Sequence, residues 1–431
     1  MLSDLTQLRS RHLEDKAGGM VSICSVHAKV IEAAMASHHG RALLIEVTPN
    51  QVNPEGGYSG LTPMDFARHL YRLAERNGFS TDRLILGADH LGPHVWRHLD
   101  AQTALARTEE MVRQCVAAGF RKIHLDTAVP CADDDSPVLL PVTAARRAAR
   151  LCLAAENSAA RRDPGDGPVY VIGQDVPRPG GGLDARGEAL PTSPEELART
   201  LDIYAEIFAS AGLRSAWKRV VAVVVQPGVD FNDYRAAPYR PERAADLSAC
   251  YSRLPGVMTF EAHATDYQTA DALKQMVRDH FNLLKVGPCL TYAFREAVYA
   301  LARIEAAWSG LKHKSNLAEV MDALMLADPR HLPPEQRGES DEARQLRQTS
   351  LRDRIRYYWS HPRAKACLNQ LLHSLDRPIP PDLVKEFLPG LDPGANLETP
   401  NAIILGHIQK ALQPYIDACH SQAASLQGPG R

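Results

Sequence analysis

The sequence predicts a (β/α)8 barrel, and three observations carry that prediction. Eight short apolar runs alternate with longer amphipathic segments, which is the pattern of parallel strands joined by helices. Several of the runs, such as 84–87 and 220–226, are mostly apolar, as expected for strands that are buried on both faces. The first run is followed by Ser25-Val-His-Ala-Lys29, which lacks the glycines of a nucleotide-binding turn, so an open doubly wound sheet is the less favoured alternative.

The predicted elements follow one another in a regular order. A short polar helix is expected at residues 4–15, ahead of the first strand. Strands are expected at 21–26, 42–47, 84–87, 122–126, 169–173, 220–226, 258–263 and 283–287. Amphipathic helices are expected at 63–76, 101–118, 142–158, 194–211, 243–253, 269–280 and 293–308. Together these elements assign residues 1–310 to the barrel.

The strand pattern stops after Trp308, and only helical patterns follow. These helices are expected at 314–328, 340–374, 381–388 and 401–420, with proline-rich breaks between them. Residues 311–420 therefore form a helical C-terminal extension, which would cover the mouth of the barrel or make a subunit interface. A homo-oligomer is the expectation, and the polar tail at 421–431 is expected to be disordered.

Composition excludes several classes of protein. The net charge of −2 gives no positive field for nucleic acid or for an anionic membrane. Eight cysteines are scattered without a C-x-x-C pair, which indicates buried thiols in a reducing compartment. The chain has neither a signal peptide nor an apolar run of about 18 residues, so it is expected to be soluble and cytoplasmic.

Polar and charged residues gather where the predicted strands end. In a barrel of this kind the chemistry lies at the carboxyl ends of the strands. A scaffold without a site could end its strands in any residue, so this inventory favours an active site. The residues concerned are Glu46, Gln51, Asn53, Tyr58, Asp89, His90, His124, Asp126, Asp175, Gln226, Glu261, His263, Asp266, Lys285 and Gly287.

A metal site is the sharpest chemical hypothesis. His90 and His263 come from the third and seventh strands, and Asp175 and Gln226 follow the fifth and sixth. Imidazole nitrogens with a carboxylate or amide oxygen suit Zn²⁺ or a similar divalent ion and leave positions open for substrate. The alternative is that both histidines are neutral barrel residues held by hydrogen bonds.

Three carboxylates and one lysine are the other candidates for chemistry. Asp89, Asp126 and Glu261 are acid–base candidates, and each could instead orient a histidine. Lys285 lies in the strand where barrels frequently hold a phosphate, so a phosphate or hydroxyl ligand is favoured over a Schiff-base lysine. Packing is the favoured role of the basic aromatic segment at 356–359, and contact with substrate or with another subunit is the alternative.

Several long motifs resemble one known family. Gly87-Ala-Asp-His-Leu-Gly-Pro93 and Phe260-Glu-Ala-His-Ala-Thr-Asp-Tyr-Gln-Thr269 are two of them. The others lie at 45–53, 56–63, 122–126, 224–228, 284–288 and 353–359. They are similar to the accessory, non-catalytic subunit of class II tagatose-1,6-bisphosphate aldolase, a family also labelled tagatose-6-phosphate kinase. The similarity runs from about residue 18 to about residue 410.

The resemblance implies one of two functions. A kinase would need a phosphate loop, and the motif G-x-x-x-x-G-K-[ST] does not occur in the sequence. One remaining function is to stabilise a separate catalytic subunit of a class II aldolase. The other is to epimerise a ketohexose or its 6-phosphate at C4, interconverting tagatose and fructose. The second is favoured, because an accessory subunit has no need of so many carboxylates and histidines at strand ends.

The resemblance also assigns roles to residues. Asp89-His90 matches the Asp-His pair of class II aldolases, a proton-transfer carboxylate beside a metal ligand, and His263 matches another metal histidine. Gln226 stands where their third metal histidine would be, and Asp175 where relatives carry Glu. The metal is expected to be Zn²⁺, with Mn²⁺, Ni²⁺ and Co²⁺ as alternatives, and it would polarise the ketose carbonyl and hydroxyl. The expected substrate-binding residues are Glu46, Gln51, Asn53, Tyr58, His124, Asp266, Lys285 and Gly287.

Overall fold

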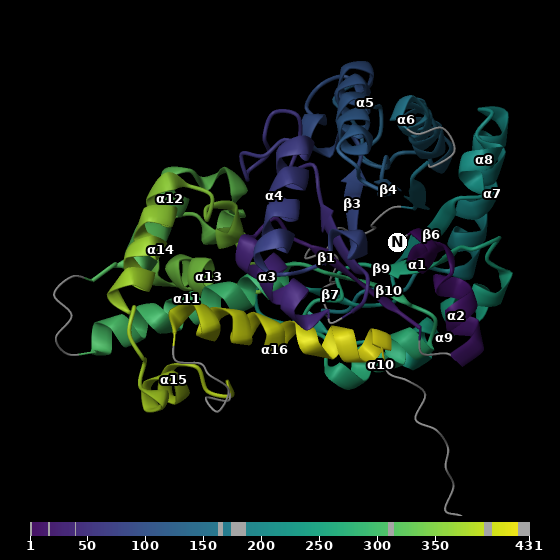
Figure 1. The fold of residues 1–431 in the computed structure, drawn as a ribbon. Coiled ribbons are helices and arrows are strands. Elements are labelled where there is room, and N and C mark those ends of the chain that lie inside the picture. Colours follow the sequence, from purple (N-terminus) through teal and green to yellow (C-terminus); the bar gives the residue numbers. More distant parts are fainter. Residues whose placement is uncertain are drawn as a thin grey trace, which may run out of the picture.

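The computed structural model confirms a closed barrel of eight parallel strands (Figure 1). It describes residues 2–15, 18–38, 40–162, 167–173, 187–308, 314–391 and 399–420. The first strand pairs with the last, which excludes the open sheet. The barrel strands are β1 (Met20–Cys24), β2 (Leu43–Val47), β3 (Leu84–Leu91), β4 (Lys122–Leu125), β5 (Val169–Ile172), β6 (Val220–Val225), β9 (Thr259–Ala262) and β10 (Leu283–Val286).

Each barrel strand is followed by a helix on the outside of the barrel. These helices are α3 (Ala28–Ser37), α4 (Pro63–Arg76), α5 (Ala101–Ala117), α6 (Pro141–Arg162), α7 (Pro194–Ser210), α9 (Pro241–Ala249), α10 (Ala270–Arg278) and α11 (Pro288–Ala307). Local sequence sets several of their starts. Thr62 and Ser193 each form a capping box, with proline at the first helical position, so α4 and α7 begin where the backbone N–H groups are satisfied.

Small elements that the sequence pattern does not predict lie in the connections. A two-stranded hairpin, β7 (Asp230–Phe231) with β8 (Ala236–Ala237), follows β6. The short helix α8 (Arg214–Trp217) precedes β6, and single 3-10 turns are η1 (Thr81–Arg83) and η2 (Pro93–Trp96). The last turn of the helix predicted at 243–253 is a 3-10 turn, η3 (Cys250–Arg253). None of the described helices is both long and apolar enough to cross a bilayer.

The inside of the barrel divides into an apolar end and a charged end. The predicted helix at 4–15 is two helices, α1 (Leu2–Thr6) and α2 (Leu8–Asp15), and their Leu5 and Leu8 close the amino end. Inward side chains such as Leu44 and Ile85 pack against them. Toward the carboxyl ends the buried residues become Glu46, Asp89, Lys122, Glu261 and Lys285. The charged side chains therefore lie at the carboxyl ends of the strands, and apolar side chains fill the barrel at the amino ends.

The C-terminal region is helical, as predicted, but the single helix predicted at 340–374 is wrong, because a 3-10 turn separates two helices there. Its elements are α12 (Leu317–Ala327), η4 (Pro329–His331), η5 (Pro334–Gln336), α13 (Asp341–Thr349), η6 (Arg354–Tyr357), α14 (Pro362–Ser374), α15 (Pro381–Phe387) and α16 (Pro400–His420). Helix α16, yellow in Figure 1, runs along the barrel and packs on α3, α10 and α11. A boundary at residue 310 stays a prediction, because 309–313 lie outside the described residues, as does the tail at 421–431.

The packing of α16 predicts that the extension and the barrel unfold together. Ile408 is fully buried on α16. Ile408→Ala should therefore lower the free energy of unfolding by about 2–5 kcal/mol, measured by urea denaturation and circular dichroism. Asn401→Ala, at an exposed position of the same helix, should change it by less than about 0.5 kcal/mol. A separate early transition that leaves the barrel transition unmoved would contradict this packing.

Candidate active site

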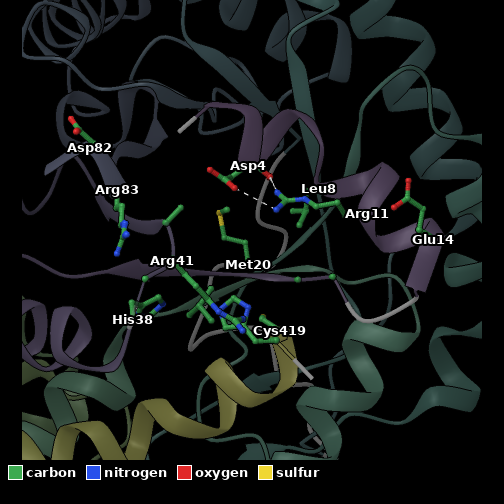
Figure 2. Close-up of a pocket in the computed structure, with 16 residues that line it drawn as sticks. Asp4, Leu8, Arg11, Glu14, Met20, His38, Arg41, Asp82, Arg83 and Cys419 are labelled. Carbon is green, nitrogen blue, oxygen red and sulfur yellow. Dashed lines mark hydrogen bonds and ion pairs between the residues drawn. The ribbon is translucent and has the colours of Figure 1, made fainter. Parts of the chain in front are cut away.

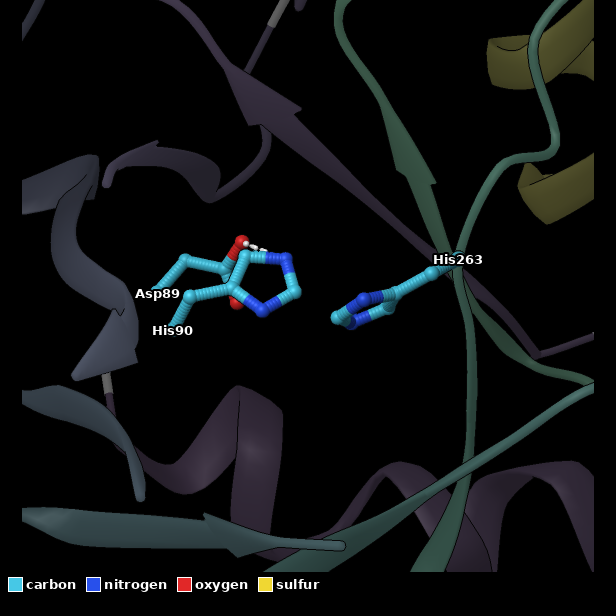
Figure 3. A group of neighbouring side chains, drawn as sticks. All are labelled: Asp89, His90 and His263. Carbon is cyan, nitrogen blue, oxygen red and sulfur yellow. Dashed lines mark ion pairs between the residues drawn. The ribbon is translucent and has the colours of Figure 1, made fainter. Parts of the chain in front are cut away.

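Strand β3 is irregular where it carries its two chemical residues. Its pairing with β4 shifts register between Ala88 and Leu91, and His90 has a φ of 53°, in the left-handed region. In a regular strand Asp89 and His90 would face opposite sides. The irregularity instead lets both contribute to one site (Figure 3), and strained backbone of this kind is common at functional positions.

Gly92 brings the ends of β3 and β4 together. A Cβ atom at this position would lie 1.6 Å from the carbonyl oxygen of Asp126, so no other residue fits here without moving the backbone. The close approach places Asp126 beside His90, with Oδ2 2.8 Å from Nδ1. The sequence Gly92-Pro93 therefore fixes a contact between two strand ends as well as ending a strand.

His90 and His263 face one another across the barrel (Figure 3). Their ring centroids are 5.0 Å apart, and one ligand atom from each of Asp89, His90 and His263 lies within 4.8 Å of the others. His90 binds Asp126 through Nδ1, and His263 binds Glu261 through Nε2 at 2.9 Å. A carboxylate on the second nitrogen is the usual support of a metal-binding histidine. The donor set therefore fits a divalent ion such as Zn²⁺.

Two lysines and three carboxylates form a buried ionic network beneath these histidines. Lys122 Nζ lies 2.7 Å from Glu46 Oε1 and 2.8 Å from Glu261 Oε2. Lys285 Nζ lies 2.5 Å from Asp89 Oδ1, 3.0 Å from Glu46 Oε2 and 3.5 Å from Glu261 Oε1. With both lysines charged and all carboxylates ionised, the network carries one excess negative charge. A cation at the adjacent histidines would balance it.

The network favours the charged forms of Asp89, Glu261 and Lys122 although these side chains are buried. Burial alone would raise the pKa of Asp89, but His90 and Lys285 outweigh it and hold that pKa well below its ordinary value. Burial likewise acts to raise the pKa of Glu261, and Lys122 and Lys285 lower it overall. For Lys122 burial acts to lower the pKa, and the two glutamates raise it. Removing one partner from such a set of ion pairs would leave a buried charge uncompensated and would destabilise the fold.

A cavity of about 470 Å³ opens above the network, at the carboxyl ends of the strands. It falls within the size range of small-molecule sites, roughly 300–1,000 Å³. Of the residues predicted from sequence, it is lined by Gln51, Tyr58, Asp89, His90, Asp126, Asp266, Lys285 and Gly287. The structure thus brings most of the predicted strand-end residues to one hollow.

Other predicted residues lie beneath or beside this cavity. Glu46 and Glu261 are in the ionic network, and His124 is fully buried with Nδ1 2.8 Å from Asp89 Oδ1. Asn53 shapes its own loop, since its side-chain oxygen accepts the N–H groups of Glu55 and Gly57. These positions suit residues that hold the site in shape better than residues that touch a substrate.

Three predicted ligands are engaged elsewhere or cannot be placed. The side-chain oxygen of Gln226 accepts the N–H groups of Gly228 and Val229, at 2.8 and 2.9 Å, so a metal role would require it to leave both. Asp266 and Gly287, both predicted to bind substrate, bond to each other, since Asp266 Oδ1 accepts the N–H of Gly287 at 3.1 Å. Asp175 lies outside the described residues. Metal binding by Gln226 and Asp175 stays a prediction.

The roof of the cavity comes from the C-terminal extension. Arg352, Arg354, Arg356 and Tyr357 line it, together with His94 from the β3–α5 connection. Sequence reasoning missed Arg352, Arg354 and His94. It noted the basic aromatic segment at 356–359, but no pattern in the sequence says which part of the barrel that segment meets.

A larger cavity, of about 620 Å³, lies at the opposite end of the barrel (Figure 2). Met20, Ala42 and Arg83 line it at or just before the amino ends of β1, β2 and β3. Its Asp4 and Arg11 pair with each other at 3.4 Å. In barrels this end serves stability, whereas the chemistry lies at the carboxyl ends of the strands. The smaller cavity is therefore the candidate active site.

Comparisons with known proteins show which proteins this chain is similar to. A sequence model of the family described as D-tagatose-1,6-bisphosphate aldolase subunit GatZ/KbaZ-like matches residues 5–420. D-tagatose-1,6-bisphosphate aldolase subunit GatZ of Salmonella enteritidis PT4 is 42% identical over 427 residues, covering 97% of this chain and 100% of that protein. The GatZ subunit of Salmonella agona is 41% identical over the same length.

A solved structure is similar over almost the whole chain. It belongs to a protein from Sinorhizobium meliloti 1021 described as a probable tagatose 6 phosphate kinase. The two chains are 41% identical, with a TM-score of 0.84, and the match covers 93% of this chain and 100% of the other.

The ionic network predicts an asymmetric response to losing a lysine. Lys122→Met removes one of the two lysines that pair with the buried Glu46 and Glu261, so it should lower the free energy of unfolding by about 3–5 kcal/mol. Lys29→Met removes a partly exposed pair with Glu32 and should cost at most about 1 kcal/mol. Denaturant unfolding of both variants measures the difference, and equal small losses would contradict a tightly paired network.

Proposed function

Because this chain belongs to the D-tagatose-1,6-bisphosphate aldolase subunit GatZ/KbaZ-like family, we propose that it acts on a ketohexose. The proposed reaction is metal-dependent epimerisation at C4, interconverting tagatose and fructose as free sugars or 6-phosphates. One observation carries the proposal: Asp89, His90 and His263 converge within 4.8 Å beneath a cavity of small-molecule size. A scaffold that only supported a neighbour would not need this convergence.

The position of C4 dictates the route. Carbon 4 is not adjacent to the C2 carbonyl, so enolisation by loss of a proton from C1 or C3 cannot invert the configuration at C4. Loss of the proton from the C4 hydroxyl lets its O–H electrons form a C4 aldehyde, while the C3–C4 electron pair moves toward C2. Rotation of the aldehyde presents its other face, re-addition restores the C3–C4 bond, and the proton returns to the new hydroxyl. This is an aldolase half-reaction run in both directions.

Asp89 is the carboxylate placed to move that proton. His124 Nδ1 and Lys285 Nζ hold Oδ1 at 2.8 and 2.5 Å, while Oδ2 lies 3.2 Å from His90 Nε2. Asp89 also lines the cavity, so a sugar hydroxyl could reach it. Of the other acid–base candidates, Asp126 pairs with Nδ1 of His90, and Glu261, which binds His263, does not line the cavity. We assign those two as positioning residues.

His90 and His263 would hold the divalent ion, with Asp126 and Glu261 fixing the orientation of their rings. When bound, such an ion supplies a Lewis acid for the ketose carbonyl and hydroxyl oxygens. Lys285, already paired with Asp89 and Glu46, keeps positive charge at the edge of the cavity where negative charge develops on the substrate.

A second candidate function is to stabilise a catalytic aldolase subunit. The names of the GatZ relatives favour it, because they describe subunits of an aldolase. Gln226 favours it too, since class II aldolases resemble this chain but carry a metal histidine there. Phosphorylation of a sugar, which the description of the Sinorhizobium meliloti protein would suggest, has no support in the sequence, because no nucleotide-phosphate loop is present.

His90 provides the test of the epimerase proposal. The purified protein with Zn²⁺, Mn²⁺ or Ni²⁺ should interconvert tagatose and fructose, free or 6-phosphorylated, and His90→Ala should abolish both the activity and the bound metal. Activity is followed by chromatography of the sugars and metal content by elemental analysis. His98→Ala, at an exposed position in the same connection, is the matched control and should leave both unchanged.

An inert pure protein would contradict the epimerase proposal. If that protein instead raised the activity or the lifetime of a co-expressed aldolase catalytic subunit, the second candidate function would replace it.

A further inference from the structure

Positive charge is concentrated in the roof of the active-site cavity. Arg352, Arg354 and Arg356 all line the cavity from a single short segment of the extension. Arg352 has a carboxylate at moderate distance, with Nε 3.6 Å from Asp233. Neither Arg354 nor Arg356 forms an ion pair with any carboxylate in the part of the chain that the structure describes. The roof therefore holds more cations than its own anions balance.

Arg354 is the least satisfied member of this group. Its Nε is buried without a hydrogen-bond partner. Burial lowers the pKa of Arg354, and the like charges of Arg356 and Arg352 add to that shift, although Tyr357 opposes it. A partly buried guanidinium among other guanidiniums destabilises the fold unless something negative joins it. The electrostatics of the roof thus point to an anion from outside the chain.

The segment is fixed in place over the barrel, so the arginines do not simply extend into solvent. Asp353, between Arg352 and Arg354, has a φ of 48° and is fully buried. Its Oδ2 accepts the hydroxyl of Thr291 at 2.6 Å, and its Oδ1 lies 3.4 Å from Arg295, both on α11. Left-handed backbone at a buried aspartate is the kind of strain that functional sites retain.

Contacts from two barrel loops hold the rest of the segment. Tyr267, which follows β9, donates its hydroxyl to the carbonyl of Leu351 at 2.6 Å. Ser360 donates to the carbonyl of Tyr58 at 2.6 Å, and the ring of Tyr58 meets that of Tyr357 at 4.6 Å. These contacts hold the arginines at the same cavity that Asp89 and His90 line.

We propose that Arg352, Arg354 and Arg356 bind the terminal phosphate of a phosphorylated ketohexose whose sugar lies over Asp89 and His90. The inference rests on the proposed ketose chemistry for the sugar, and it selects the phosphorylated sugar as substrate over the free one. Guanidinium groups match phosphate oxygens in pairs, and a dianion suits three of them better than a single carboxylate does. Lys285, the phosphate ligand expected from sequence, is instead committed to Asp89 and Glu46.

Binding of fructose 6-phosphate and fructose by calorimetry tests the assignment without requiring turnover. The wild type should bind the phosphorylated sugar at least about tenfold more tightly than the free sugar, because its phosphate gains charge-assisted hydrogen bonds that the free sugar lacks. Arg354→Gln should remove most of that preference while leaving the weak binding of fructose unchanged. Arg344→Gln, at an exposed position of α13, should retain it.

Thermal unfolding separates a binding role from a structural one. Without ligand, Arg354→Gln should melt at the same temperature as the wild type or higher, because it relieves repulsion among partly buried like charges. Inorganic phosphate should raise the melting temperature of the wild type, and it should raise that of Arg354→Gln much less. Arg354→Lys, which keeps the charge but loses the planar fork, should lie between the two.

The assignment falls if Arg354→Gln binds fructose 6-phosphate as the wild type does, or if the wild type prefers a ketohexuronate with a terminal carboxylate. It also falls if Arg354→Gln unfolds at a lower temperature without ligand and Arg354→Lys restores the melting temperature and the binding together. If the phosphate preference depends on Arg354 in a protein with no epimerase activity, the phosphate site stands and only the proposed reaction fails.

Discussion

The structure depends on a buried set of ion pairs that a closed barrel makes possible. Lys122 joins Glu46 to Glu261, and Lys285 joins both to Asp89, all with side chains that are buried. Charges at this depth persist only when each is paired on several sides. Strands β2, β3, β4, β9 and β10 each supply one of these residues, so the charges can meet only when the ring of strands has closed. The site therefore forms only in the closed barrel, and the closed barrel contains charges that need one another as partners.

The same network explains how two histidines can be aimed at one point. Glu261 contacts Lys122 and the ring of His263, so the ionic network also orients a candidate metal ligand. Asp89 contacts Lys285 and His124, and it adjoins His90 in the chain. An aldolase and a C4 epimerase need the same equipment here, since both make and break the C3–C4 bond. A protein related to aldolase subunits could therefore carry out C4 epimerisation with the same type of site.

Most of the fold was predictable from the sequence because strands buried on both faces are continuous apolar runs. All eight predicted runs are barrel strands, and the polar residues after them largely reach one cavity. Features that depend on contacts between residues far apart in the sequence were less predictable. The arginine segment meets the barrel through Thr291 and Tyr58, and no local pattern encodes such a meeting. Gln226 was predicted as a metal ligand by its position, whereas its oxygen satisfies backbone N–H groups of its own loop.

The convergence of His90 and His263 on a cation is the central claim, and anomalous X-ray scattering tests it most directly. Crystals grown with Zn²⁺ and measured on both sides of the zinc absorption edge should give one strong anomalous peak between the two imidazole rings. A peak elsewhere, or none at this position in a protein that retains its fold, would contradict the metal-dependent account of this site.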